Sequence, residues 1–397
     1  MTDRPVENQV RCFLRLLAAV AAFAVVLAPW WFSRDLARVA FPGFVVASAS
    51  LPVDAQPFFL SEEINPSSSE AKAHSGALAE MPDGTLAVAW YAGSGEGAKD
   101  VTIQFSTRGN DGKWSSPRTI FDRAAVSAVM DRYVLSLGNP LLLPESDGRL
   151  GLLFVSIAAG KWSGSSINYT LSNDGGATWS NPQKLTLNPL ANLSALPRNP
   201  PAALADGGWV VPIYEEFLGR FPEMLWLRSQ DPVTTAAVSR MDDGMSVFQP
   251  SVVPLSANDA LAFYRDDSGS GRVMISESSD AGKTWSKGEP STLPNFDSGV
   301  CALRLADGRL ICAFNDSTSR KRENLRLAVS DDKGKSWRTF ATLAEERGEN
   351  FAYPYMVLGR DGRVRMVYSA RDTRIVYAEF NAAWIDAQAA KAGEGAL

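Results

Sequence analysis

The sequence predicts an all-β fold, a six-bladed β-propeller built from a recurring type of hairpin and preceded by an N-terminal transmembrane helix. Three observations lead to this prediction. One eight-residue motif occurs three times, a hairpin signal recurs at intervals of 49 to 64 residues, and an apolar run of 17 residues precedes all of these repeats.

The first observation is the motif S-x-D-x-G-x-x-W, which we call the Asp box. It occurs at residues 172–179, 278–285 and 330–337, and a degenerate copy lies at 106–114. Its Asp is suited to accept backbone N–H groups of its own turn, and its Gly takes a positive φ at little cost. The Trp is expected to fold under the hairpin and anchor it. Three copies in one chain indicate a repeat protein.

The second observation is a turn dipeptide, usually Asp-Gly, that is followed by an apolar run, which is a strong hairpin signal. Six units of about fifty residues, each two hairpins long, predict propeller blades of four strands. A four-stranded sheet alone leaves two open edges, so the blades must close into a ring. Residues 58–60 are the predicted closing strand. The six turns are Asp83-Gly84, Asp147-Gly148, Asp206-Gly207, Asn258-Asp259, Asp307-Gly308 and Asp361-Gly362.

The third observation is the apolar run at residues 16–32, which follows three arginines and ends with Trp30 and Trp31. It is just long enough to cross a membrane, and tryptophans of this kind are typical interface anchors. We expect an uncleaved signal-anchor in the cytoplasmic membrane with the propeller on the extracytoplasmic side; the alternative is secretion after signal cleavage. The predicted parts are a cytoplasmic segment (1–15), the anchor (16–32), a tether (33–57), the propeller (58–386) and a C-terminal tail (387–397).

Composition excludes several classes of function. The net charge of −5, without a basic stripe, speaks against nucleic-acid binding. One His and three Cys exclude a Cys/His zinc site of the usual spacing, and no nucleotide-binding glycine motif occurs, so no metal or cofactor is expected. Cys301 and Cys312 flank one hairpin, and we expect two small core residues there, with a disulfide as the alternative.

The chain resembles the sialidases (neuraminidases), which are six-bladed propellers with Asp boxes. The resemblance covers roughly residues 70–386 and is strongest near the C-terminus. It rests on Tyr353-Pro354-Tyr355, Asp361-Gly362, Val367-Tyr368, the segment 380–384 (FNAAW), Tyr264-Arg265-Asp266 and Arg322-Glu323-Asn324-Leu325. It implies an exo-glycosidase that hydrolyses a terminal acidic sugar from a glycan.

The resemblance also implies roles for particular residues. Arg265 and Arg322 fall where the family binds the sugar carboxylate, although Arg320 and Arg326 lie close enough in sequence to be alternatives to Arg322. A guanidinium group suits this task because its paired donors match a carboxylate. Tyr353 falls at the nucleophile, which is a tyrosine in sialidases. Glu96 falls in the loop of the acid/base residue.

Two residues depart from the family pattern. His74 stands where the family has its first carboxylate-binding arginine, and Gln249 stands where it has the Glu that activates the tyrosine. A Gln cannot take a proton from Tyr353, so Glu215 and Glu216 become the nearest candidates. Strand alternation allows only one of these two to face the site.

Two other functions stay open at this point. Loss of the activating Glu fits a non-catalytic glycan-binding propeller at the membrane. A uronate polysaccharide lyase, with His74 and Tyr353 as base and acid, needs no Glu at position 249. Trp90, Trp162 and Trp226 lie outside the Asp boxes and are possible sugar platforms, with core packing as the alternative.

Overall fold

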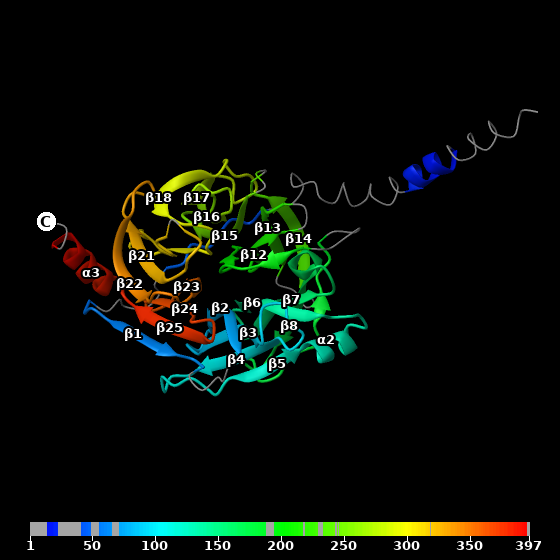
Figure 1. Ribbon diagram of the computed structural model, residues 1–397, viewed down its shortest axis with the longest axis horizontal. Helices are drawn as coiled ribbons and strands as arrows, with labels where there is room; N and C mark the ends of the chain where they lie inside the picture. The colour runs from blue at the N-terminus through cyan, green and yellow to red at the C-terminus, as the bar shows by residue number, and fades with distance from the viewer. Residues whose placement is uncertain are drawn as a thin grey trace, which may run out of the picture.

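The computed structural model describes residues 14–22, 41–48, 55–65, 71–187, 194–216, 219–228, 233–242, 244, 246–317 and 319–394. It contains six antiparallel sheets, which surround a common axis as the blades of a propeller (Figure 1). Neighbouring sheets contact one another all the way round the ring. The predicted six-bladed all-β fold is therefore confirmed.

The first three blades follow one another in chain order, and each runs from an inner to an outer strand. Blade 1 consists of β2 (Lys72–Glu80), β3 (Leu86–Gly93), β4 (Thr102–Arg108) and β5 (Arg118–Asp122). Blade 2 consists of β6 (Ser136–Pro144), β7 (Leu150–Ile157), β8 (Ser165–Ser172) and β9 (Gln183–Lys184). Blade 3 consists of β10 (Leu196–Pro197), β12 (Trp209–Glu215), β13 (Phe221–Arg228) and β14 (Thr234–Arg240), and β11 (Ala202–Ala203) also pairs with β12.

The next three blades repeat the pattern, and three helical segments accompany the blades. Blade 4 consists of β15 (Val247–Pro254), β16 (Ala260–Asp266), β17 (Arg272–Ser278) and β18 (Glu289–Pro294). Blade 5 consists of β19 (Cys301–Arg304), β20 (Leu310–Phe314), β21 (Asn324–Ser330) and β22 (Arg338–Glu345). Blade 6 consists of β23 (Phe351–Leu358), β24 (Val364–Ala370), β25 (Arg374–Phe380) and β1 (Phe59–Glu63). The helical segments are α2 (Arg123–Val129), the 3₁₀ turn η2 (Lys161–Gly164) and α3 (Ala382–Glu394).

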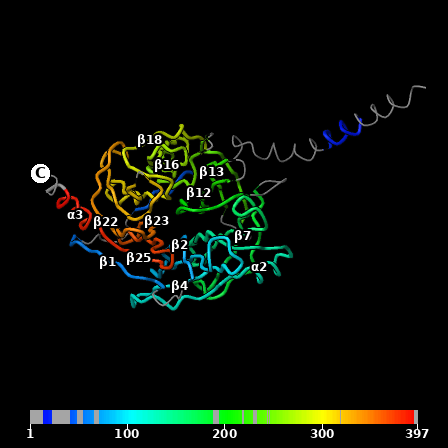
Figure 2. Tube along the Cα trace, in the orientation of Figure 1, coloured from blue at the N-terminus to red at the C-terminus, as the bar shows by residue number. Residues whose placement is uncertain are grey.

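The ring is closed by the strand that the sequence predicted. β1 comes from the N-terminal side of the propeller and pairs antiparallel with β25, so that Phe59 lies opposite Phe380 (Figure 2). Asn381 reinforces the closure, because its side chain accepts the Phe58 N–H at 3.0 Å and also caps α3 through the Trp384 N–H. Helix α3 extends across the boundary predicted between propeller and tail.

The Asp boxes form the predicted turns. In each of the three full copies, the Asp accepts the backbone N–H four residues later at 2.8 to 2.9 Å, and the box Gly has a positive φ. The box Trp packs against the preceding blade: Trp179 of blade 2 lies 5.7 Å from Phe105 of blade 1, and Trp337 of blade 5 lies 5.7 Å from Phe263 of blade 4 (ring centres). The Trp therefore joins neighbouring blades as well as anchoring its own hairpin.

The N-terminal region packs against the propeller in its described part. The Phe44 N–H donates to the Ala257 carbonyl at 2.9 Å and the Val45 N–H to the Ala203 carbonyl at 2.8 Å. Among the described residues, no helix has the length and apolarity that crossing a membrane requires. Residues 14–22 are helical, whereas 23–32, with Trp30 and Trp31, lie outside the described residues. The transmembrane helix therefore stays a prediction.

Cys301 and Cys312 are both buried and free. They lie in neighbouring strands but not opposite each other, since Cys301 faces Ala313 and Cys312 faces Ala302. The expectation of two small core residues is confirmed.

Candidate active site

The inner strands share a backbone feature at the end of the ring where they begin. At or just before the start of each one, a non-glycine residue has a φ between 40° and 66°. In four blades the pairing register also shifts at this point, which marks a β-bulge. Bulges re-aim side chains and are frequent beside active sites. The six residues, in chain order, are Ser75, Asn139, Ser194, Gln249, Asp297 and Tyr353.

A pocket of about 260 Å³ lies at this end of the ring. All six blades contribute to its lining, so the pocket exists only in the closed propeller. Its residues are Glu96, Asn139, Trp162, Arg198, Tyr214, Glu216, Gln249, Arg265, Arg322 and Tyr353. Six of the eight site residues predicted from the sequence therefore come together here: Glu96, Glu216, Gln249, Arg265, Arg322 and Tyr353.

Of the three arginines that line the pocket, Arg265 and Arg322 were predicted from the sequence. Arg265 donates from Nε to Asp297 Oδ1 at 2.8 Å and from Nη1 to Gln249 Oε1 at 3.3 Å. Burial disfavours its charge, but the electrostatic interactions with Tyr353 and the Asp297 carboxylate outweigh this and raise the pKa of Arg265. Arg322 donates to Ser298 Oγ and to the Asp297 carbonyl, both at 3.2 Å.

Arg320 and Arg326 do not line the pocket. Arg320 is exposed and forms an ion pair with Asp267 at 3.0 Å, and Arg326 pairs with Asp316 at 3.2 Å. The structure therefore favours Arg322 among the three arginines of this segment.

Tyr353 lies between cationic groups. The Cζ atoms of Arg198 and Arg322 are 4.9 Å and 5.4 Å from the centre of its ring. Space for the ring depends on Gly299, since a Cβ there would come within 3.3 Å of both Tyr353 Cδ1 and Gln249 Oε1. The positive φ of Tyr353 is unusual for an aromatic residue and turns its side chain toward the pocket.

Two carboxyl groups line the pocket in different surroundings. Glu96 accepts the Trp162 indole N–H at 2.9 Å. The Trp162 ring packs directly against the backbone of Gly138, since a Cβ at that position would lie 2.6 Å from the ring. Burial raises the pKa of Glu216; Arg220 and Arg265 oppose this shift, while the charges of Glu96 and Asp297 add to it.

Glu215 points away from the pocket, as alternation along a strand requires for the neighbour of Glu216. Its carboxylate lies 3.5 Å from Arg240 on blade 3. Of the two candidates for a base near Tyr353, the structure therefore leaves Glu216.

Gln249 and His74, the two departures from the family pattern, have different surroundings. Gln249 donates its amide N–H to the Tyr214 hydroxyl at 3.1 Å and accepts from Arg265, so both ends of the amide have partners. His74 lies beside Tyr353, with ring centres 6.2 Å apart, but it does not line the pocket. Burial lowers the pKa of His74, against the charges of Asp372 and Glu96, and favours the neutral imidazole. This position therefore lacks the permanent positive charge that an arginine would supply.

Sequence reasoning missed Arg198, as well as Asn139 and Tyr214, among the residues that line the pocket. Arg198 follows β10 and is 4% exposed. A signal for it was present: Ser75, Asn139, Arg198 and Tyr353 each precede the Gly of their own hairpin turn by nine residues. Applying one offset to every blade would have found Arg198 and Asn139 together with Tyr353.

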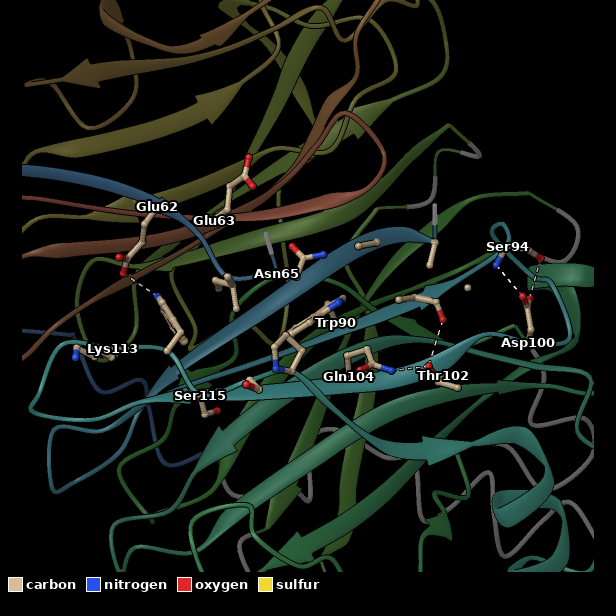
Figure 3. Close-up of a pocket in the computed structure, with 18 of the residues that line it drawn as sticks. Glu62, Glu63, Asn65, Trp90, Ser94, Asp100, Thr102, Gln104, Lys113 and Ser115 are labelled. Atoms are coloured by element: carbon tan, nitrogen blue, oxygen red, sulfur yellow. Dashed lines mark hydrogen bonds between the residues drawn. The ribbon is translucent and has the colours of Figure 1, made fainter. Parts of the chain in front are cut away.

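A larger cavity lies elsewhere, between β1 and blade 1 (Figure 3). Its volume is about 1090 Å³, but its described lining contains no arginine, and the charged residues of that lining are Glu62, Glu63, Asp100 and Lys113. Such a cavity is a poor host for an acidic sugar because carboxylates outnumber cations. The candidate active site is therefore the smaller central pocket.

The three tryptophans considered as sugar platforms lie in different surroundings. Trp90 and Trp226 are almost fully buried, whereas Trp162 lines the central pocket. Within the part of the chain that the structure describes, no group of three or more His, Cys, Asp or Glu side chains is placed to hold a metal ion.

Comparison with known proteins places the chain in a family. The model of the BNR repeat-like domain matches residues 84–366. Among solved structures, a Hadza microbial sialidase is 16% identical (TM-score 0.64; 78% of this chain and 65% of that chain covered). The intramolecular trans-sialidase from Ruminococcus gnavus is 12% identical (0.63; 79% and 95%). The Trypanosoma rangeli sialidase is 13% identical (0.65; 84% and 61%).

The chain thus spans less than two thirds of the length of the Hadza and trypanosomal enzymes. No curated protein matches it by sequence. At identities of 12 to 16% the structural likeness concerns the fold, whereas the domain match covers more than half of the chain. The chain belongs to the BNR repeat-like family, as a divergent member with the six-bladed propeller of the sialidases.

Proposed function

We propose that this protein is a sialidase-type glycoside hydrolase that removes a terminal acidic sugar from a glycan. One observation carries the proposal: all six blades contribute to a pocket in which Arg265 and Arg322 face Tyr353 together with two carboxyl groups. The sialidases and trans-sialidase of the same fold support the reaction class.

Binding of the sugar carboxylate is assigned to Arg265 and Arg322. Asp297 orients both groups, accepting from Arg265 through its carboxylate and from Arg322 through its backbone carbonyl. Held in this way, the guanidinium groups lose little side-chain entropy when an anion binds. Paired N–H donors on each match the two oxygens of a carboxylate.

The bond cleavage is assigned to Tyr353, Glu96 and Glu216. The Tyr353 hydroxyl attacks the anomeric carbon while Glu96 protonates the leaving oxygen, and water then releases the sugar with Glu96 acting as base. Gln249 cannot accept the Tyr353 proton, so Glu216 takes this role. Its raised pKa suits it, because a base works best with a pKa near the working pH.

The sugar itself is proposed only by class. A sialic acid, another nonulosonic acid and a uronic acid all carry a carboxylate that two guanidinium groups would bind. The apolar run at 16–32 supports the further proposal that the protein acts at the outer side of the cytoplasmic membrane, on extracytoplasmic glycans.

Turnover of an aryl sialoside and of aryl uronides by the full-length protein tests the function. At least one substrate should release its phenol, and Tyr353→Phe should lower kcat by several orders of magnitude, as loss of a nucleophile does. Tyr133→Phe, at an exposed tyrosine outside the pocket, is the matched control and should keep full activity. If the folded protein releases phenol from none of these substrates, the hydrolase assignment is wrong.

The neutral His74 beside Tyr353 favours a second candidate, a uronate lyase. In that reaction an arginine neutralises the uronate carboxylate, His74 removes the proton beside it, and Tyr353 protonates the leaving oxygen. The product carries a new C=C bond and absorbs in the ultraviolet, whereas a hydrolysis product does not. Absorbance during digestion of a uronate polysaccharide therefore separates the two reactions.

Gln249, whose amide has a hydrogen-bond partner at both ends, favours a third candidate, a non-catalytic glycan-binding propeller. It predicts equal glycan affinity for the wild type and Tyr353→Phe and no turnover by either protein.

A further inference from the structure

Among the described residues, Arg198 differs from Arg265 because it has no anionic partner, and from Arg322 because it is almost fully buried. Arg265 meets the carboxylate of Asp297, whereas the one hydrogen bond that the Arg198 guanidinium makes to the described residues runs from Nη2 to the Pro354 carbonyl at 3.2 Å. Among the described residues, its Nε and Nη1 have no hydrogen-bond partner and no contact with solvent. No carboxylate of the described residues lies within ion-pair distance of it.

Such an arrangement lowers the stability of the folded protein. A buried charge without a counter-ion destabilises the folded state, and its unused donors add to the cost. The titratable groups nearest Arg198 are Tyr353, Cys301, Tyr214 and Tyr355, all of them neutral at neutral pH in their ordinary forms. No described neighbour therefore supplies the missing negative charge.

The position of Arg198 is nevertheless well defined. The residue before it accepts a hydrogen bond from Asn139 of blade 2 through the Pro197 carbonyl at 3.1 Å. The residue after it, Asn199, donates to the Gln249 and Pro250 carbonyls of blade 4 at 3.0 and 2.9 Å. Blades 2 and 4 thus fix the backbone on both sides, and the face of the Tyr353 ring supports the guanidinium group.

We propose that Arg198 is a substrate-binding residue that accepts the carboxylate of the sugar at the floor of the pocket. It supplies from blade 3 the cation that the neutral His74 does not supply from blade 1. This inference rests on the proposed function in one respect, the acidic class of the sugar. It deepens that function, because an uncompensated guanidinium group selects a charged carboxylate over a neutral polar group.

The donor pattern of Arg198 fits this role. Nη2 carries two hydrogens, one on the edge shared with Nε and one on the edge shared with Nη1, and Pro354 uses only one of them. Whichever hydrogen is used, one complete pair of parallel N–H donors stays without a partner among the described residues. A carboxylate accepts such a pair with both oxygens, whereas a hydroxyl or a single carbonyl satisfies only half of it.

The test measures binding rather than turnover, with full-length protein and four probes: N-acetylneuraminic acid, glucuronic acid and the methyl ester of each. At least one acid should bind the wild type and raise its Tm. Arg198→Met should weaken the binding of that acid at least about tenfold, the loss expected for one charge-assisted pair of hydrogen bonds. The affinity for its uncharged methyl ester should be the same in both proteins.

Two further variants separate binding from a structural role. Without ligand, Arg198→Met should melt at the same temperature as the wild type or higher, since no ion pair is lost. Arg198→Lys keeps the charge but not the paired donors, and should bind the acid with intermediate affinity. Arg132→Met is the matched control: Arg132 is also partly buried with a free Nε, but it bonds to Asn168 outside the pocket, so acid binding should not change.

Two outcomes overturn the inference: equal acid affinity in the wild type and Arg198→Met, or no binding of either acid to the wild type. These outcomes are distinct from failure of the proposed function. Acid binding that depends on Arg198 without any turnover would leave this inference standing and remove the hydrolase. Turnover with unchanged acid binding in Arg198→Met would do the reverse.

Discussion

At the scale of single residues, the chemistry of the pocket depends on which adjacent carboxylate faces it. Glu215 and Glu216 are neighbours in sequence, yet one pairs with Arg240 at the rim of blade 3 and the other lines the pocket. The first therefore stays fixed as a surface ion pair. The pKa of the second, Glu216, is raised by burial and by the nearby charges of Glu96 and Asp297.

This contrast predicts the pH dependence of the reaction. A base must be ionised, so kcat should fall as pH drops through the pKa of Glu216, which lies above the usual value of 4.5. Glu216→Gln should remove this acid limb and lower kcat roughly 10²- to 10⁴-fold. Glu215→Gln is the matched control and should leave both rate and limb unchanged. A limb that persists in Glu216→Gln would assign the base to another group.

The sequence predicted the residues that lie inside recognisable motifs. Tyr353, Arg265 and Arg322 have flanking residues typical of sialidases, and all three reach the pocket. Arg198 lies in a Pro-rich segment (197–201, PRNPP) without such flanks. What singles it out is that no described residue supplies a counter-ion for it, and a sequence does not display this. The protonation of His74 was also beyond the sequence, because it depends on burial by distant segments.

At the scale of elements, the Asp boxes were predictable because their hydrogen bonds are local. In the third copy, Asp332 accepts from both the backbone N–H and the hydroxyl of Ser336, at 2.9 and 2.6 Å. The bulges of the inner strands were not predictable, since a bulge depends on the partner strand and on the ring axis. Yet the bulges aim Gln249, Asn139 and Tyr353 at the pocket.

The hydrogen bonds of the box predict acid sensitivity. The Ser336 side chain and backbone lower the pKa of Asp332 from 3.8 to about 2. Because the folded-state pKa is the lower one, the stabilisation is fully present above about pH 4 and is lost as pH falls toward 2. Asp332→Ala should therefore lower Tm at pH 7, and the difference from the wild type should shrink toward zero near pH 2.

Thermal melts of the two proteins across this pH range make the measurement. Asp331→Ala is the matched control, because the neighbouring Asp331 makes only an exposed ion pair with Arg338. It should change Tm little at any pH. A constant difference between Asp332→Ala and the wild type from pH 7 to 2 would contradict the proposed role of the ionised box Asp.

At the scale of the whole molecule, the ring has two ends with different tasks. The pocket lies where the inner strands begin, and the hairpin turns lie where those strands end. The N-terminal segment 41–48 contacts the second end, beside the turns at 205–208 and 256–259. Segment 41–48 therefore lies at the end of the ring opposite the pocket.

Phe44 is the residue that fixes this segment. It is 3% exposed and packs in one cluster with Leu204, Met224 and Trp226 of blade 3 and with residues of blade 4. Phe44→Ala should lower the free energy of unfolding by about 3–5 kcal/mol, the usual cost of removing a buried Phe side chain. Urea unfolding of the full-length protein measures this change.

The neighbouring residue provides the control, because the side chain of Val45 is 48% exposed although its backbone makes the same kind of contact. Val45→Ala should change the free energy of unfolding by no more than about 0.5 kcal/mol. Since Phe44 lies at the end of the ring opposite the pocket, folded Phe44→Ala should also bind acidic sugars as the wild type does. Equal stability of the two variants would mean that segment 41–48 rests on the surface of the propeller without contributing to its core, and a loss of sugar affinity in Phe44→Ala would mean that the two ends of the ring are coupled.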